Sequence, residues 1–300
     1  MTDGQPMPPY VRWIGLAFGV VLVVAAVVTV VTQHEKVGTA LAAIRQPDAV
    51  DVVVLFGTVL ANIVLTGLMF SVLMSRHGRV GLVEMQALIA AAALANYLPL
   101  RPGLFGRAAY HKAFNDIALG ATVKVTLLAL AISVAIAAYL ACCLFIGGRV
   151  SIPLWVFVGG AIPVLATVAA VPASRRIGVA ALIRYVEVLL LAVRYQAAFA
   201  LIGSPIDLAA ALTISCVALV VTLIPLTGNG LGLREWAVGI AAGLLTPYVL
   251  ELGLAADLVN RAAEALLVAV LGLSAFAWLA ARRRSATSLR RSRPTPGPTS

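Results

Sequence analysis

Residues 125–146 read VTLLALAISVAIAAYLACCLFI, from Val125 to Ile146, and contain no charged side chain. About 20 consecutive apolar residues are enough for a helix to cross the hydrocarbon core of a bilayer. The whole chain of 300 residues has this character, since 62% of it is hydrophobic, 11% is charged and the mean hydropathy is +1.02. Soluble domains are about 45–50% apolar and about 25% charged. We therefore predict an all-helical, polytopic membrane protein without a soluble catalytic domain.

Seven other apolar runs are similar in length, which predicts eight helices that cross the membrane. Together with Val125–Ile146 they are Trp13–Thr32, Val52–Leu73, Ile152–Val171, Tyr185–Ile202, Leu208–Ile224, Trp236–Leu250 and Ala262–Ala281. A ninth run, Val83–Leu98, is shorter and contains Glu84, Gln86 and Asn96. It either spans the membrane or is re-entrant, returning on the side from which it enters.

The formal net charge of +10 predicts topology rather than nucleic-acid binding. Lys and Arg collect in cytoplasmic loops and contact anionic lipid, so we expect no nucleic-acid partner. If Val83–Leu98 is re-entrant, three basic segments lie on the side of the arginine-rich tail, while Glu251 and Asp257 lie in an outside loop. These basic segments are Ser75–Leu82, Pro99–Ala118 and Pro172–Arg184. We favour this arrangement, which puts both termini in the cytoplasm of a multi-pass cell-membrane (inner or plasma membrane) protein.

The domain organisation follows from the same composition. Trp13–Thr32 is long enough to span and has no clear cleavage site after it, so we expect a retained first helix rather than a signal peptide. Residues 1–281 are predicted to form one helical domain. Residues 282–300 combine arginines with alternating prolines, which predicts a disordered cytoplasmic tail whose arginines contact anionic headgroups.

The first candidate site is the segment from Asn96 to Arg107, because charged or irregular segments are costly in lipid and mark function. Two prolines and two glycines interrupt the helix there: Pro99, Pro102, Gly103 and Gly106. Arg101 and Arg107 stand beside the opened backbone. Free N–H groups and guanidinium groups together suit a lipid phosphate. The alternative is a cytoplasmic connector whose arginines only follow the positive-inside rule.

The second candidate site is the segment from Pro225 to Glu235. It contains three alternating glycines, Gly228, Gly230 and Gly232, which allow close backbone approach or positive φ, and then Arg234. No strand precedes it, so the nucleotide-binding interpretations of such glycine spacing fail. The alternative is a tight turn between two spans.

Charge pairs at helical spacing form the third candidate. Arg261 and Glu264 are three residues apart and can pair on one helical face. A similar set, Arg184, Glu187 and Arg194, shares roughly one face of another helix. These groups either line a path for substrate or are structural pairs that pin helices together.

The sequence offers little for catalysis or metal binding. The three histidines and three cysteines have no metal-ligand spacing, and no nucleophile motif is visible. We therefore predict no catalytic residue, no metal and no cofactor. An intramembrane enzyme would require convergence of carboxylates such as Glu187, Glu235 and Glu264.

The two proline-containing segments are similar to each other, because Leu98-Pro99-Leu100 matches Ile224-Pro225-Leu226 and an arginine follows each. Transporters often contain two related halves whose broken helices meet at the membrane midplane. An internal repeat is one interpretation of this similarity. An inverted repeat would place the two segments on opposite sides, which agrees with the charge distribution only if both reach the midplane.

The order of these motifs resembles the lysylphosphatidylglycerol synthase transmembrane-region family of flippase-like membrane proteins. The first family motif corresponds to Asn96, Pro99, Arg101, Gly103 and Arg107. The second corresponds to Pro225, Asn229, Gly230, Leu231, Gly232, Arg234 and Glu235, and an arginine of the final helix corresponds to Arg261. The chain departs from the family at Leu104, where an acidic residue is usual, and at Asn229, which is often glycine. The missing carboxylate predicts a more cationic site.

The resemblance implies a protein that binds or moves a lipid, such as an anionic, aminoacylated or polyprenyl-phosphate-linked lipid. We expect a flippase-like transporter and not an enzyme, because the soluble aminoacyl-transferase domain of the synthases is missing. Its expected substrate-binding residues are Asn96, Pro99, Arg101, Gly103, Arg107, Gly230, Gly232, Arg234, Glu235, Arg261 and Glu264. The alternatives are an accessory module that binds lipid or a membrane glycosyltransferase without transport, and an intramembrane enzyme for a polyprenyl-linked substrate.

Overall fold

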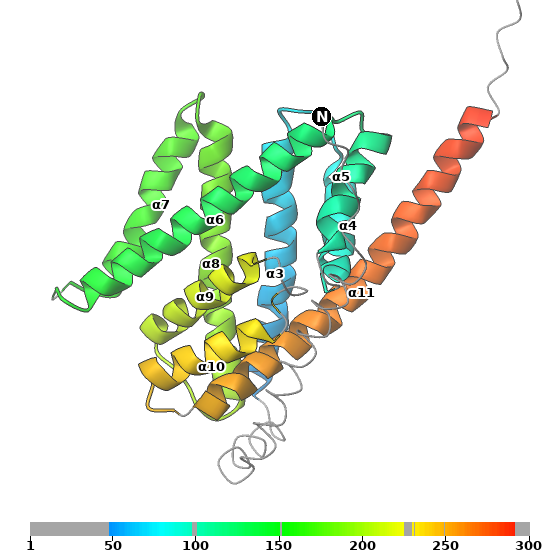
Figure 1. Cartoon of the computed structure of the whole chain (residues 1–300). Helices are drawn as coiled ribbons and strands as arrows, with labels where there is room; N and C mark the ends of the chain where they lie inside the picture. The colour runs from blue at the N-terminus through cyan, green and yellow to red at the C-terminus, as the bar shows by residue number, and fades with distance from the viewer. Residues whose placement is uncertain are drawn as a thin grey trace, which may run out of the picture.

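The computed structural model describes residues 48–97, 101–150, 152–224, 230, 232–248 and 250–291, with side chains as far as Arg282. This part of the chain contains helices and no strand, as predicted (Figure 1). The helices are α3 (Ala49–Met74), α4 (Leu82–Ala95), α5 (Pro102–Phe114), α6 (Leu119–Gly147), α7 (Leu154–Ala170), α8 (Arg175–Leu201), α9 (Leu208–Leu223), α10 (Leu233–Leu245) and α11 (Leu250–Arg291).

Three of these helices, α3, α6 and the part of α11 up to Arg282, are long and apolar enough to cross a membrane. Helix α6 carries two apolar stripes on different faces. One is buried in the protein and consists of Val125, Ala129, Ile132, Ile136 and Leu140. The other is exposed and consists of Val123, Leu127, Leu130 and Val134. A helix that is apolar all round is typical of a membrane span, so the exposed stripe indicates a surface that faces lipid.

Helices α3 and α8 pack against each other and run antiparallel along the molecule (Figure 1). Leu55, near the start of α3, belongs to the same apolar cluster as Ala198 and Leu201 at the end of α8. Leu73, near the end of α3, clusters with Ala180 near the start of α8. The end of α3 therefore lies at the end of the bundle where α8 begins, and α8 ends at the opposite end.

Two pairs of short helices form hairpins. Each hairpin opens at one of these opposite ends of the bundle, which means that the chain both enters and leaves the hairpin there. The first hairpin is α4–α5; a Cβ on Gly78, just before α4, would lie 2.7 Å from the side chain of Ile117, just after α5. It therefore opens where α3 ends. The second hairpin is α9–α10, and the Tyr248 hydroxyl after α10 donates to the carbonyl oxygen of Pro205 before α9, at 3.0 Å. It therefore opens where α8 ends (Figure 1).

The hairpin helices are short for membrane spans. Helices α4, α5, α9 and α10 have 14, 13, 16 and 13 residues. A full crossing takes about 20 residues, so each of these helices is shorter than a typical membrane span. The eight crossings predicted from the sequence therefore stay a prediction, and the span expected at Trp13–Thr32 lies outside the described residues.

Some helix boundaries differ from those expected. Helix α8 begins at Arg175 rather than Tyr185, because arginine is a good helix former and the basic segment continues the helix. Helix α11 begins at Leu250 rather than Ala262, so Asp257 lies in a helix and is fully buried instead of lying in an outside loop. The same helix runs to Arg291, beyond the boundary expected at Ala281.

Candidate functional site

A cavity of about 310 Å³ lies where the two hairpins meet α3, α8 and α11. Four arginines line it: Arg101, Arg184, Arg194 and Arg234. The other polar groups in its wall are Asn62, Thr66, Asn96, Tyr97, Thr222 and Glu264. Charged side chains inside a membrane protein are expensive and mark functional sites. We call this space the arginine cavity.

Arg234, in the first turn of α10, is almost completely buried and each of its nitrogens has a partner. Its Nη2 donates to Asp257 Oδ1 at 3.1 Å, and its Nη1 donates to Glu264 Oε2 at 3.1 Å. Its Nε donates to the phenolic oxygen of Tyr195 at 3.2 Å, and the Tyr195 hydroxyl donates to Asp257 Oδ1 at 2.7 Å. The network ties α8, α10 and α11 together beside the cavity.

Two more arginines complete this buried cluster. Arg194 Nη2 lies 3.5 Å from Glu264 Oε2, so one carboxylate is shared by arginines of α8 and α10. Arg261 Nε donates to Glu235 Oε1 at 3.2 Å. The ion pairs of the cluster therefore join three arginines to three carboxylates: Arg194, Arg234 and Arg261 to Glu235, Asp257 and Glu264. The charges of these side chains cancel.

Arg184 is also neutralised. Its Nη1 lies 2.8 Å from Glu187 Oε2, which confirms the pair expected from their spacing, and its Nε donates to Ser133 Oγ at 2.7 Å. The other oxygen of Glu187 accepts from Thr66 Oγ1 on α3. Arg194, expected on the same face as this pair, is directed instead to Glu264.

Arg101 is different, because it forms no ion pair within the part of the chain that the structure describes. It belongs to the first hairpin and donates from Nη2 to the carbonyl oxygens of Thr222 and Ile224 at the end of α9, the latter at 3.3 Å. The last carbonyls of a helix carry partial negative charge and lack intrahelical partners. Arg101 thus joins the two hairpins and gives the cavity an excess positive charge.

The backbone at Arg101 is also unusual. Its φ of 50° and ψ of 61° place it in the left-handed region, and Pro102 follows as the first residue of α5. A non-glycine residue there costs roughly 1–2 kcal/mol and persists where the surrounding structure demands it. The two candidate segments of the sequence are therefore brought together, and the residue at the junction is the strained arginine.

The remaining residues expected in the first segment have separate positions. Asn96 caps the end of α4 and lines the arginine cavity. Gly103 packs α5 on α4, because a Cβ there would lie 2.2 Å from the carbonyl oxygen of Ala92. Pro99 lies outside the described residues. Asn96 is therefore placed to meet a ligand of the arginine cavity, whereas Gly103 acts through helix packing.

Arg107 does not line the arginine cavity. It is buried on α5, where Nη2 donates to Thr126 Oγ1 at 3.1 Å and the guanidinium carbon lies 3.8 Å from the centre of the Phe70 ring. It lines a second, mainly apolar cavity of about 570 Å³ between α4, α5 and α11, together with Gly103. The structure therefore separates Arg107 from Arg101 and Arg234.

The glycines expected in the second segment set the start of α10. Gly230 and Gly232 have φ values of 75° and 81°, which side-chain-bearing residues rarely adopt. Gly232 is the N-cap of α10, and Arg234 and Glu235 follow in the first turn, both buried. These glycines therefore position the two charged residues, and Glu235 and Arg261 form a pair behind the cavity wall.

Sequence reasoning missed Asp257 and Tyr195 as members of the site. The last apolar run of the sequence begins at Ala262, which leaves Asp257 in the preceding loop. A signal was present, because Asp257, Arg261 and Glu264 recur at intervals of four and three residues, the spacing of one helical face. Tyr195 has no comparable signal, since a single tyrosine in an apolar helix is ordinary.

No family model, no curated protein and no solved structure matches this chain.

The wall of the arginine cavity presents hydrogen-bond donors, and its carboxylate is already paired with arginine. Glu187 and Glu264 both accept from arginines, and each of the three glutamates considered for catalysis pairs with a different arginine. Within the described residues no group of His, Cys, Asp and Glu is placed to hold a metal ion. The cavity wall therefore presents mainly cationic hydrogen-bond donors.

Proposed function

We propose that this protein binds the anionic headgroup of a membrane lipid in the arginine cavity and moves the lipid between the leaflets. The observation that carries the proposal is Arg101, a cation at the meeting point of two hairpins without a carboxylate partner among the described residues. Guanidinium groups recognise phosphate through paired hydrogen bonds. An anion at this point would neutralise the excess charge of the wall.

The size of the cavity supports a headgroup as the ligand. A volume of about 310 Å³ is at the lower end of small-molecule sites. It suits a polar headgroup whose acyl chains remain in the bilayer. The resemblance of the two motifs to the lysylphosphatidylglycerol synthase transmembrane-region family supports the same class of substrate, an aminoacylated or polyprenyl-phosphate-linked lipid.

The side chains divide the task as follows. Arg101 and Asn96 meet the phosphate from the first hairpin. Arg234 and Arg194 lie across the cavity and share Glu264, so a phosphate can replace this carboxylate without leaving either arginine unpaired. In this proposal Glu264 is the counter-ion of the two arginines before the substrate binds, and the phosphate of the substrate then displaces it.

The proposal includes a membrane topology. The two hairpins are re-entrant from opposite faces, and α3, α6, α7, α8, α11 and Trp13–Thr32 cross completely. Two of the predicted crossings, Leu208–Ile224 and Trp236–Leu250, thereby become one re-entrant pair, which leaves both termini on the cytoplasmic side. The opposed hairpins also support the inverted internal repeat, because both candidate segments reach the middle of the molecule.

A reconstituted-liposome assay with fluorescent lipid probes tests the function. The probes are phosphatidylglycerol, lysylphosphatidylglycerol and a polyprenyl phosphate, each scored for transfer between leaflets. We expect Arg101→Ala to abolish transfer of the transported lipid, while Arg149→Ala, an exposed arginine at the end of α6, leaves it unchanged. Unchanged transfer by Arg101→Ala in correctly folded protein would refute the role of the cavity.

A second candidate is lipid binding without transport, as expected of an accessory module. It is favoured by the completeness of the Arg234 network, in which all three guanidinium nitrogens are satisfied across α8, α10 and α11. Such a network resists rearrangement. Specific lipid retention without transfer, or co-purification of a glycosyltransferase, would identify this function.

A further inference from the structure

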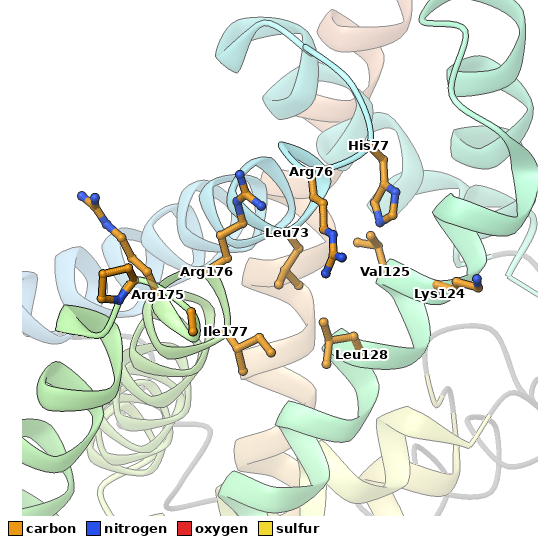
Figure 2. Close-up of a pocket in the computed structure, with 11 residues that line it drawn as sticks. Leu73, Arg76, His77, Lys124, Val125, Leu128, Arg175, Arg176 and Ile177 are labelled. Carbon is orange, nitrogen blue, oxygen red and sulfur yellow. The ribbon is translucent and has the colours of Figure 1, made fainter.

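A second basic site lies at the end of the bundle where the first hairpin opens. A pocket of about 580 Å³ is formed there by the end of α3, the start of α6 and the start of α8 (Figure 2). Its charged rim consists of Arg76, Lys124, Arg175 and Arg176, with the imidazole of His77 beside them. None of these residues belongs to the arginine cavity.

Among the residues that the structure describes, this pocket has no counter-charge. Its lining includes no carboxylate, and none of its four cations forms an ion pair with another described residue. The contrast with the cluster around Arg234 is direct, because the arginines there are matched by carboxylates. Four like charges from three helices around one pocket create a local positive potential. Binding of an anion would neutralise part of this charge.

The start of α8 adds to the same potential. The N-cap residue Ser174 makes no side-chain hydrogen bond to the helix, since its hydroxyl donates to the carbonyl oxygen of Val168. Arg175 and Arg176 occupy the first turn, where the backbone N–H groups of a helix lack intrahelical partners. These groups favour an anion, phosphate in particular.

The floor of the pocket is apolar. It is made by Leu73, Val125, Leu128 and Ile177, and Arg76 extends across it toward Leu128 and Ile177 (Figure 2). A soluble anion would gain nothing from this surface. A lipid would place its phosphate among the cations and the start of its acyl chains on the floor.

We propose that this pocket binds the phosphate group of an anionic membrane lipid, at a site separate from the arginine cavity. The same cations could also take phosphate from solution, but the apolar floor favours the lipid. The proposal does not depend on lipid transport, because the pocket and the arginine cavity share no lining residue. It adds a lipid-binding position beside the opening of the first hairpin.

The test uses the purified full chain in a neutral detergent. Phosphatidylglycerol, phosphatidylcholine, glycerol phosphate and inorganic phosphate are titrated separately, and melting temperature and lipid retention in native mass spectrometry are recorded. The pocket variant is R76Q/R175Q/R176Q. Its matched control, R79Q/K112Q/R149Q, removes three exposed cations that do not line the pocket. Both triple variants are also made with Arg101→Ala, which removes binding by the arginine cavity.

We expect phosphatidylglycerol, but not phosphatidylcholine, to stabilise the parent protein and to remain bound. The pocket variant should bind phosphatidylglycerol with an affinity at least about tenfold lower, with or without Arg101→Ala. The reason is that each cation near an anionic lipid contributes about 1 kcal/mol to binding. A pocket-dependent effect of inorganic phosphate equal to that of the lipid would support a phosphate site supplied from solution. Equal lipid binding by the pocket variant and its control would overturn the proposal.

Discussion

Arg101 and Ile224 join two hairpins that open at opposite ends of the molecule. The guanidinium of Arg101, between α4 and α5, donates to the carbonyl oxygen of Ile224, at the end of α9, at 3.3 Å. The contact bridges the two parts of the sequence in which prolines and glycines interrupt the helices. It connects positions that are distant in the chain through one side chain and one helix terminus.

Replacement of Arg101 by glycine or by alanine should separate its backbone role from its charge. Both changes remove the guanidinium, so both should abolish lipid transfer in liposomes. Glycine accepts the φ of 50° without strain, whereas alanine does not. The glycine variant should therefore be more stable than the alanine variant by about 1 kcal/mol, measured by thermal unfolding in detergent. Equal stabilities would show that the left-handed conformation is not retained.

Arg234→Met should be among the most destabilising single changes in the chain. It leaves Asp257 fully buried without its arginine, and loss of one partner of a buried ion pair costs about 3–5 kcal/mol. The double variant Arg234→Met/Asp257→Asn should recover part of this stability, because the stranded charge is removed. Equilibrium unfolding of all three proteins checks the coupling, and a double variant less stable than Arg234→Met would contradict it.

Gly103→Ala should loosen the first hairpin, while Gly106→Ala should not. A Cβ at Gly103 would overlap the carbonyl oxygen of Ala92, whereas a Cβ at Gly106 meets nothing within 4 Å. Backbone displacement of this kind typically costs about 1–3 kcal/mol, and alanine at an unobstructed helical position stabilises by up to about 1 kcal/mol. The melting temperatures should therefore move in opposite directions. A similar shift for both variants would argue against the close packing of α4 and α5.

Single-cysteine labelling should place the hairpin openings on opposite faces of the membrane. In a background without Cys142, Cys143 and Cys216, cysteines are introduced at the exposed positions Arg79, Arg175 and Pro247. The first two should react from the cytoplasmic side, and Pro247→Cys should react only from the other side. Reaction of all three with a membrane-impermeant reagent from one side is incompatible with opposed hairpins.

The helical class could be predicted from the sequence, because it follows from the composition and length of the apolar runs. Both are local properties of the chain. The sequence also located the two segments that meet at the cavity, since proline, glycine and arginine in an apolar chain are local signals. Arg184 and Glu187 were correctly paired because a spacing of three residues fixes neighbours on a helix.

The partners of the other charges could not be predicted in this way. Arg261 pairs with Glu235 of another helix, because the packing of α10 on α11 brings that carboxylate within reach. Arg107 stands in the same motif as Arg101, yet it faces a different cavity, since α5 turns the two side chains in different directions. Such pairings depend on tertiary contacts that a single sequence does not contain.

The opposed hairpins have an electrical consequence. A headgroup of one negative charge that passes the contact between Arg101 and Ile224 moves through the membrane potential. That movement changes its energy by about 2.3 kcal/mol for each 100 mV. In a cell whose interior is negative, the potential drives an anion outward, so under the proposed function the membrane voltage would supply energy for outward transfer of the lipid.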